Sequence, residues 1–120
     1  MMLRHILRTI CLGACLLWSR PSSAQQTFVG FQTGDTLLAI CNADQEARIY
    51  CAGYIIGIEE ILFTGNAING FRACSLPNEG PTSHHLEDVV LTYLQNHSAT
   101  RRLTATGLVA AALAQAYPCD

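Results

Sequence analysis

The sequence contains no lysine, and arginine is its only strongly basic residue type. Seven arginines stand against nine acidic residues in the 120-residue chain. Without a basic patch the chain lacks the electrostatic footprint of a nucleic-acid-binding protein, so we expect no nucleic-acid partner. Mild acidity keeps a small domain soluble, and it also suits a partner with a positive surface.

Long apolar runs are lacking too, because the longest one, residues 10–18, is too short to span a bilayer. Arg4 and Arg8 precede this run, and the small residues at 22–24 follow it. Positive charge, a short apolar core and a small-residue site are typical of a secretory signal peptide, here residues 1–24. The sequence therefore predicts export to the periplasm with no stable membrane span.

Two other interpretations of the leader stay open. A membrane anchor would need the apolar run to continue past Ser19, where polar residues begin. Lipid attachment at Cys15 would leave Leu16 and Leu17 at the start of the mature chain, where a polar tether is usual. We expect cleavage after Ala24, which leaves a mature domain of residues 25–120 with a poorly ordered segment at 25–34. Four arginines and nine carboxylates then remain, a net charge of −5.

The mature chain has no Cys-x-x-Cys pair, and its adjacent histidines, His84 and His85, lie in a different kind of segment from the cysteines. These absences argue against a zinc site, and we expect neither a metal nor a cofactor. An even number of cysteines in a short exported chain instead predicts two disulfides. The four cysteines are Cys41, Cys51, Cys74 and Cys119.

Period-two alternation is absent except for a short stretch at 27–31, and apolar residues recur at helical spacing after residue 34. The pattern predicts an all-α, disulfide-stapled bundle of about four helices. A long irregular connection, residues 65–81, contains the turn-forming Gly, Asn and Pro residues of this half. The expected helices begin at Asp35, at Asp44, after Thr82 or Ser83, and after Thr104 or Thr106.

Two glycines, Gly53 and Gly57, interrupt the longest predicted helix. Each costs about 1 kcal/mol relative to alanine in a helix interior. Because they are four residues apart, they share one face of the helix and leave a shallow groove. We expect the alanine-rich segment 107–116 to pack closely there, with Tyr54 filling the space beside it.

Helical geometry favours one pairing of the cysteines. Cys41 reaches Cys51 if the first two helices form an antiparallel hairpin, and Cys74 then pairs with Cys119. Joining Cys51 to Cys74 would require the chain to return along nearly the whole helix in a short connection, which matches helical rise poorly. The pairs Cys41–Cys74 and Cys51–Cys119 remain the alternative.

An ordered series of cysteine, glycine and tyrosine motifs runs through almost all of the mature chain. The motifs are Leu37-Leu38-x-x-Cys41, Cys51-x-Gly53-Tyr54-Ile55-x-Gly57, Cys74-x-Leu76-Pro77, Val89-Val90-x-x-Tyr93-Leu94 and Ala112-Leu113-x-x-Ala116-Tyr117-Pro118-Cys119. This series resembles the Rap/Tai family of type VI secretion immunity proteins. The resemblance implies a periplasmic helical domain, often a homodimer, that binds and blocks a peptidoglycan amidase toxin. Glu59-Glu60 departs from the family, in which many members have a single aspartate.

No catalytic arrangement is predicted. Glu59 and Glu60 point about 100° apart on a helix and cannot converge on one bond. Cysteines in disulfides cannot act as nucleophiles, and histidines at a helix start are usually solvated. We therefore expect a non-enzymatic inhibitor.

The expected mechanism is occlusion of the toxin by the loop of residues 76–82, which Cys74 holds at its base. The candidate partner-binding residues are Leu76, Asn78, Glu79 and Thr82. Two other functions stay open: an acid-stress holdase chaperone of the periplasm, and an envelope protein with no toxin partner.

Overall fold

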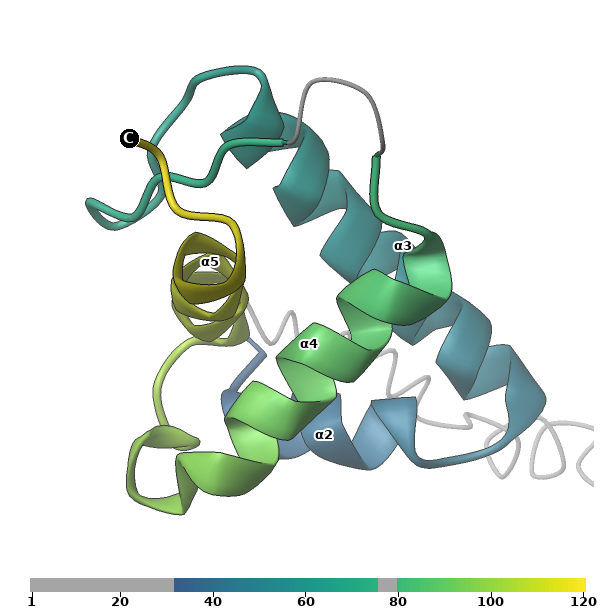
Figure 1. Ribbon diagram of the computed structural model, residues 1–120. Helices are drawn as coiled ribbons and strands as arrows, with labels where there is room; N and C mark the ends of the chain where they lie inside the picture. The colour runs from purple at the N-terminus through teal and green to yellow at the C-terminus, as the bar shows by residue number, and fades with distance from the viewer. Residues whose placement is uncertain (1–31, 76–79) are drawn as a thin grey trace, which may run out of the picture.

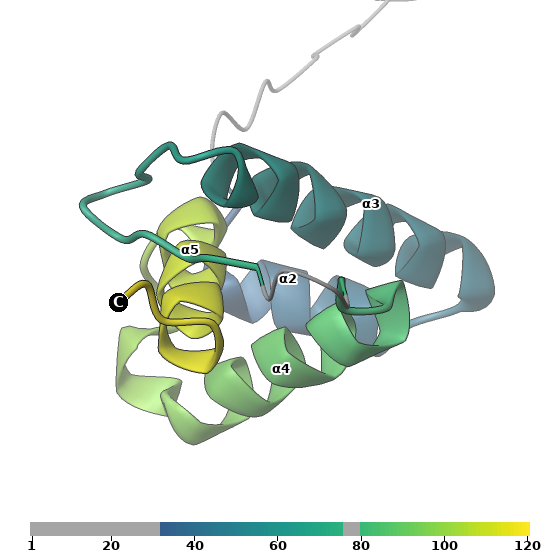
Figure 2. The ribbon, with the colours of Figure 1, turned by 45° about the horizontal axis from the view of Figure 1, so that its top comes forward.

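The computed structural model describes residues 32–75 and 80–120, and this part of the chain is a bundle of α-helices (Figure 1). Every pair of the four helices is in contact. In Figure 2, α3 and α4 lie on either side of α2, and α5 crosses one end of the bundle. The predicted all-α fold of about four helices is confirmed. The elements are α2 (Gly34–Cys41), α3 (Gln45–Phe63), α4 (Ser83–Asn96), the short 3-10 helix η1 (Ser98–Thr100) and α5 (Ala105–Ala116).

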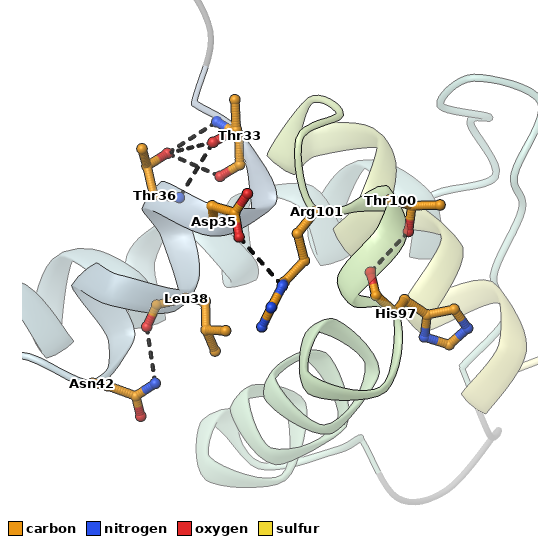
Figure 3. A network of polar contacts seen from close by, with 8 residues as sticks. All are labelled: Thr33, Asp35, Thr36, Leu38, Asn42, His97, Thr100 and Arg101. Atoms are coloured by element: carbon orange, nitrogen blue, oxygen red, sulfur yellow. Dashed lines mark hydrogen bonds and ion pairs between the residues drawn. The ribbon is translucent and has the colours of Figure 1, made fainter.

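Side-chain caps set where three of the helices begin. The Thr33 hydroxyl accepts from the backbone N–H of Thr36 at 3.3 Å, and the Thr36 hydroxyl accepts from the Thr33 N–H at 3.0 Å (Figure 3). Asp44 accepts from Ala47 N at 2.9 Å and so caps α3, as predicted. Each cap satisfies a backbone donor that the first helical turn leaves without a partner.

The chain that leads into α2 is tied to the segment that leads into α5. Gly34 N donates to Leu103 O at 3.0 Å and Asp35 N to Arg101 O at 2.9 Å. Asp35 and Arg101 also form an ion pair at 3.3 Å (Figure 3). Although the sequence places residues 32–34 in a poorly ordered segment, they pair with this second segment.

Gly34 allows the close approach of these two segments. A Cβ atom at this position would lie 2.5 Å from Leu108 Cδ1 and 3.0 Å from Arg101 O. Any larger residue would therefore push α2 away from the start of α5.

The core lies where the four helices meet, and α5 is its most buried element, with every residue from Leu108 to Leu113 buried. Alanine at three of these positions keeps the side chains short, so the neighbouring helices approach α5 closely. None of the helices in the described ranges is long and apolar enough to cross a membrane. The largest fully buried side chains are Leu37, Ile55, Leu62, Leu94, Leu113, Val90, Val109 and Cys51.

Two disulfides crosslink the bundle, and they join the cysteines as expected. Cys41, the last residue of α2, is bonded to Cys51 in α3, with their Cα atoms 5.2 Å apart. Cys74, in the connection between α3 and α4, is bonded to Cys119 beyond α5, with a Cα separation of 5.0 Å. The first bond closes the helical hairpin, and the second ties the connection to the C-terminus.

The predicted packing at Gly53 and Gly57 is wrong. Both glycines are exposed, and a Cβ atom added to either would have no neighbour within 4 Å. The buried side of α3 is instead formed by Cys51, Ile55, Ile58 and Leu62. The physical reason is that α3 carries apolar residues on all its sides, so their spacing does not single out one face.

Tyr54 contacts α5 through its hydroxyl, which lies 2.8 Å from the Thr106 hydroxyl. Its ring packs against the core and also stacks near Tyr50, with 6.3 Å between the ring centroids. Ile55, the next residue along the helix, is fully buried. The face of α3 that meets the core is therefore rotated away from the glycines.

Candidate functional site

The connection between α3 and α4 contains an ordered loop at residues 65–71 that projects beyond the helices in both views (Figures 1 and 2). Ile68 and Phe71 exchange backbone hydrogen bonds of 3.0 and 2.9 Å. Between them, Asn69 and Gly70 both have positive φ, 50° and 81°. Asn-Gly with this geometry forms a tight hairpin turn, so the tip of the loop has a defined shape.

The base of this loop is held at several points. Arg72 donates from Nη2 to Gly65 O at 3.0 Å and so closes the loop. Ala73 is buried, and Cys74 N donates to Tyr117 O at 2.9 Å beside the Cys74–Cys119 disulfide. An ordered loop loses less conformational entropy when it binds, which favours tight binding.

Three of the four predicted partner-binding residues, Leu76, Asn78 and Glu79, lie outside the described residues. Thr82 is described, and it is the N-cap of α4, where its hydroxyl accepts from His85 N at 3.2 Å. Its observed contact is therefore a capping one. His84 is exposed at the start of the same helix.

An apolar hollow of about 360 Å³ lies between the projecting loop and α5. Phe71 and Leu103 line it while remaining 40% and 53% exposed. Gly107 brings the loop close to α5, because a Cβ atom there would lie 2.7 Å from Asn69 Nδ2. These residues were not predicted from the sequence, although an apolar residue directly after an Asn-Gly turn is a signal that could have indicated Phe71.

A second hollow, of about 460 Å³, lies between α4 and α5, and it holds the side chains of Asp88, Tyr93 and His97. The His97 ring stacks on Tyr93 at 3.9 Å, and its Nδ1 lies 2.7 Å from Tyr93 O. A carbonyl oxygen can only accept, so Nδ1 donates this bond. Within residues 32–75 and 80–120, no group of three or more His, Cys, Asp or Glu side chains could hold a metal ion.

Partial burial raises the pKa of Glu59 above its ordinary value of 4.5, and the neighbouring charge of Glu60 raises it further. Burial also raises the pKa of the Tyr117 hydroxyl, to which the charge of Glu59 adds. The groups that affect the pKa of Glu59 or respond to its charge are the Glu60 carboxylate and the Tyr117 hydroxyl. This arrangement does not form an acid–base pair directed at one bond.

Glu59→Gln is expected to raise the melting temperature at neutral pH. Because the pKa of Glu59 is raised in the folded chain, protonation of its carboxyl stabilises the fold. This contribution to stability is fully present below pH 4.5 and is lost as pH rises through the folded-state pKa. Thermal melts across this range measure the difference, which should vanish well below pH 4.5. Glu60→Gln removes only the charge repulsion between the two carboxylates, so it should raise the melting temperature less than Glu59→Gln does. Equal gains in the two variants would contradict burial as the larger cause of the raised pKa of Glu59.

The described domain is a small all-α protein with two disulfides and a projecting, ordered loop. A family model described as Rap1a immunity proteins matches residues 33–119, which include all four described helices in full. The chain belongs to the Rap1a immunity protein family, and the resemblance seen in its motifs is confirmed. It is therefore an immunity protein directed against a secreted effector. No curated protein and no solved structure matches the chain.

Proposed function

We propose that the chain binds and occludes a peptidoglycan-cleaving amidase toxin of a type VI secretion system, in the periplasm and without catalysis of its own. The observation that carries the proposal is the family match over residues 33–119. An immunity protein acts by stoichiometric binding, so a rigid surface that fits the toxin is sufficient for its function.

Action in the periplasm is supported by the two disulfides and by the predicted signal peptide, residues 1–24. Disulfides persist in oxidising compartments such as the bacterial periplasm and are rare in the cytosol. The homodimer implied by the resemblance stays a prediction at this point.

The surface proposed to contact the toxin is the connection between α3 and α4. Its ordered loop, residues 65–71, presents Phe71 next to the exposed Leu103, and the predicted contacts Leu76, Asn78 and Glu79 follow directly in the chain. Aromatic residues, phenylalanine among them, are enriched at the cores of protein interfaces relative to the rest of the surface. The net charge of −5 on the mature chain favours a toxin with a positive surface.

The test uses residues 25–120 with intact disulfides and the cognate amidase that the proposal expects a neighbouring gene to encode. At equimolar concentration the domain should form a complex and abolish muropeptide cleavage, without cleaving muropeptides itself. Full amidase activity at saturating immunity protein would overturn the proposal. Suppression of aggregation of unrelated proteins at acid pH, with no inhibition of the amidase, would favour the holdase alternative.

Phe71→Ala is expected to weaken the complex at least about fivefold, because truncating a central interface residue costs more than about 1 kcal/mol. Titration calorimetry or inhibition curves measure the change. Gln95→Ala, an exposed change on α4 outside both the loop and its hollow, is the matched control and should leave the affinity unchanged. Equal effects of the two variants would place the toxin on another surface.

A further inference from the structure

The two disulfides differ in how far solvent reaches them. Cys41 and Cys51 belong to the hydrophobic core and are only 6% and 1% exposed. Cys74 and Cys119 are both exposed. Because thiol–disulfide exchange begins when a thiolate attacks one of the two sulfur atoms, its rate depends on access to them. A small dithiol can therefore attack the second bond in the folded chain, whereas the first bond becomes accessible only when the core opens.

The backbone around the two bonds differs as well. Cys41 ends α2 and Cys51 lies inside α3, so both belong to helices. Cys74 lies in the connection between α3 and α4, and Cys119 lies beyond α5, where the C-terminal segment runs beside this connection (Figures 1 and 2). Within the described residues, one backbone hydrogen bond joins the two segments, from Cys74 N to Tyr117 O at 2.9 Å. A single hydrogen bond contributes little net free energy in water, so the disulfide is the stronger link.

This link determines how firmly the projecting loop is held. Arg72 closes residues 65–71 with a hydrogen bond of 3.0 Å to the backbone, and Cys74 follows it by two positions. If the disulfide is opened, the base of the loop keeps the hydrogen bond to Tyr117 and the buried side chain of Ala73. Fewer constraints give the loop more freedom, and a more mobile loop loses more conformational entropy when it binds.

The exchange reaction is balanced by the reductant alone. A thiolate of the dithiol attacks the sulfur of Cys74 or Cys119, the S–S bond breaks, and the other cysteine leaves as a thiolate that takes up a proton. The second thiol of the reductant then resolves the mixed disulfide. Two electrons and two protons pass to the two cysteines, and the reductant leaves as a disulfide.

From these observations we propose that the Cys74–Cys119 disulfide is a site of thiol–disulfide exchange with a dithiol reductant, and that its opening loosens the loop at residues 65–71 while the four helices stay folded. The Cys41–Cys51 bond does not exchange in the folded chain. The loop therefore has its binding shape only in an oxidising compartment, and the inhibitory form develops after export. This last consequence rests on the proposed function, whereas the exchange itself does not.

The first test compares the two bonds under one reductant. Folded residues 25–120 are treated with dithiothreitol, the reaction is stopped with excess iodoacetamide, and the alkylated cysteines are identified by peptide mass mapping. Cys74 and Cys119 should be labelled at least about tenfold faster than Cys41 and Cys51. Equal rates in the folded chain would overturn the proposal. In concentrated urea, where both bonds are accessible, the rates should become similar, and a difference that persists there would contradict access as its cause.

The second test asks whether opening the bond frees the loop. NMR order parameters of the Ile68 and Phe71 amides are measured before and after selective reduction, with sulfate added to stabilise the reduced chain. They should fall from about 0.85 to below about 0.6, while those of residues 108–113 in α5 stay near 0.85. The variant Cys74→Ser/Cys119→Ser is the control: it should show the lower loop values without reductant and should not respond to it. Unchanged loop values, or unfolding of α5, would overturn the proposal.

Inhibition of the cognate amidase separates this proposal from the proposed function. The oxidised chain should inhibit, and the selectively alkylated chain, desalted before the assay, should inhibit at least about tenfold more weakly because its loop must be ordered on binding. An oxidised chain that does not inhibit would contradict the proposed function, while the labelling and NMR results would still decide the exchange. Equal inhibition by the oxidised and the alkylated chain would overturn the effect on binding that is proposed here.

Discussion

Removal of the Cys74–Cys119 disulfide is expected to lower the free energy of unfolding by about 4 kcal/mol. The bond joins residues 45 positions apart, so it closes a long loop in the unfolded chain. In the chain-entropy model the stabilisation grows with the logarithm of the number of residues in the closed loop. The double variant Cys74→Ser/Cys119→Ser avoids a free thiol, and urea denaturation measures the loss.

Cys41→Ser/Cys51→Ser is the comparison, because this bond spans only 10 residues and about 2.7 kcal/mol is expected from chain entropy. Cys51 is buried, so a serine there adds a packing and desolvation cost that exposed Cys74 and Cys119 do not incur. Toxin binding should separate the two variants more clearly. Of the two disulfides, only Cys74–Cys119 holds the base of the 65–71 loop. Its removal should therefore weaken inhibition of the toxin even in buffers where the variant is folded. A stability loss below about 1 kcal/mol for that variant would contradict the chain-entropy argument.

The helices could be predicted from the sequence because their limits depend on neighbouring residues. Asp44 and Thr82 each accept a hydrogen bond from the backbone three residues further on, as a helix cap requires. Pro118 and the Gly/Asn residues of the connection mark where helices cannot continue. These local signals act within one turn, so no knowledge of the tertiary structure is needed to see them.

The disulfide pairing could also be predicted, because a rigid helix restricts which cysteines can meet. Cys51 lies about one and a half turns into α3, and only Cys41, at the end of the preceding helix, reaches it through a short hairpin.

Which face of α3 enters the core could not be predicted. Isoleucine occurs on its outer face at Ile49 and Ile61 and on its inner face at Ile55 and Ile58. Burial is decided by the helices that pack against it, and these contacts join residues far apart in the sequence. Gly34 lies close to Leu108, and Gly107 lies close to Asn69. Because both neighbours are distant in the sequence, no local pattern distinguishes these two glycines from exposed ones.

Phe71 and Leu103 were not among the binding residues predicted from the sequence, for a related reason. The connection at residues 65–81 was predicted to be irregular from its Gly, Asn and Pro content, but the loop at 65–71 within it was not singled out. Its proximity to Leu103 depends on how the connection folds back over α5, which sequence spacing does not specify. The exposed pair of Phe71 and Leu103 therefore became visible only in three dimensions.

Ile55→Ala is expected to destabilise the domain by about 2–5 kcal/mol, because it removes a fully buried side chain and leaves a cavity that the surrounding helices fill only in part. Ile49→Ala is the matched control: it is the same change in the same helix, at a position that is 67% exposed, and a surface change usually alters stability by about 0.5 kcal/mol or less. Urea denaturation of both variants should be measured at a protein concentration at which the chain is monomeric, so that self-association does not contribute to the measured stability. If the two variants lost similar stability, α3 would have to be rotated about its axis relative to the arrangement described, which would bury the face that carries Gly53 and Gly57.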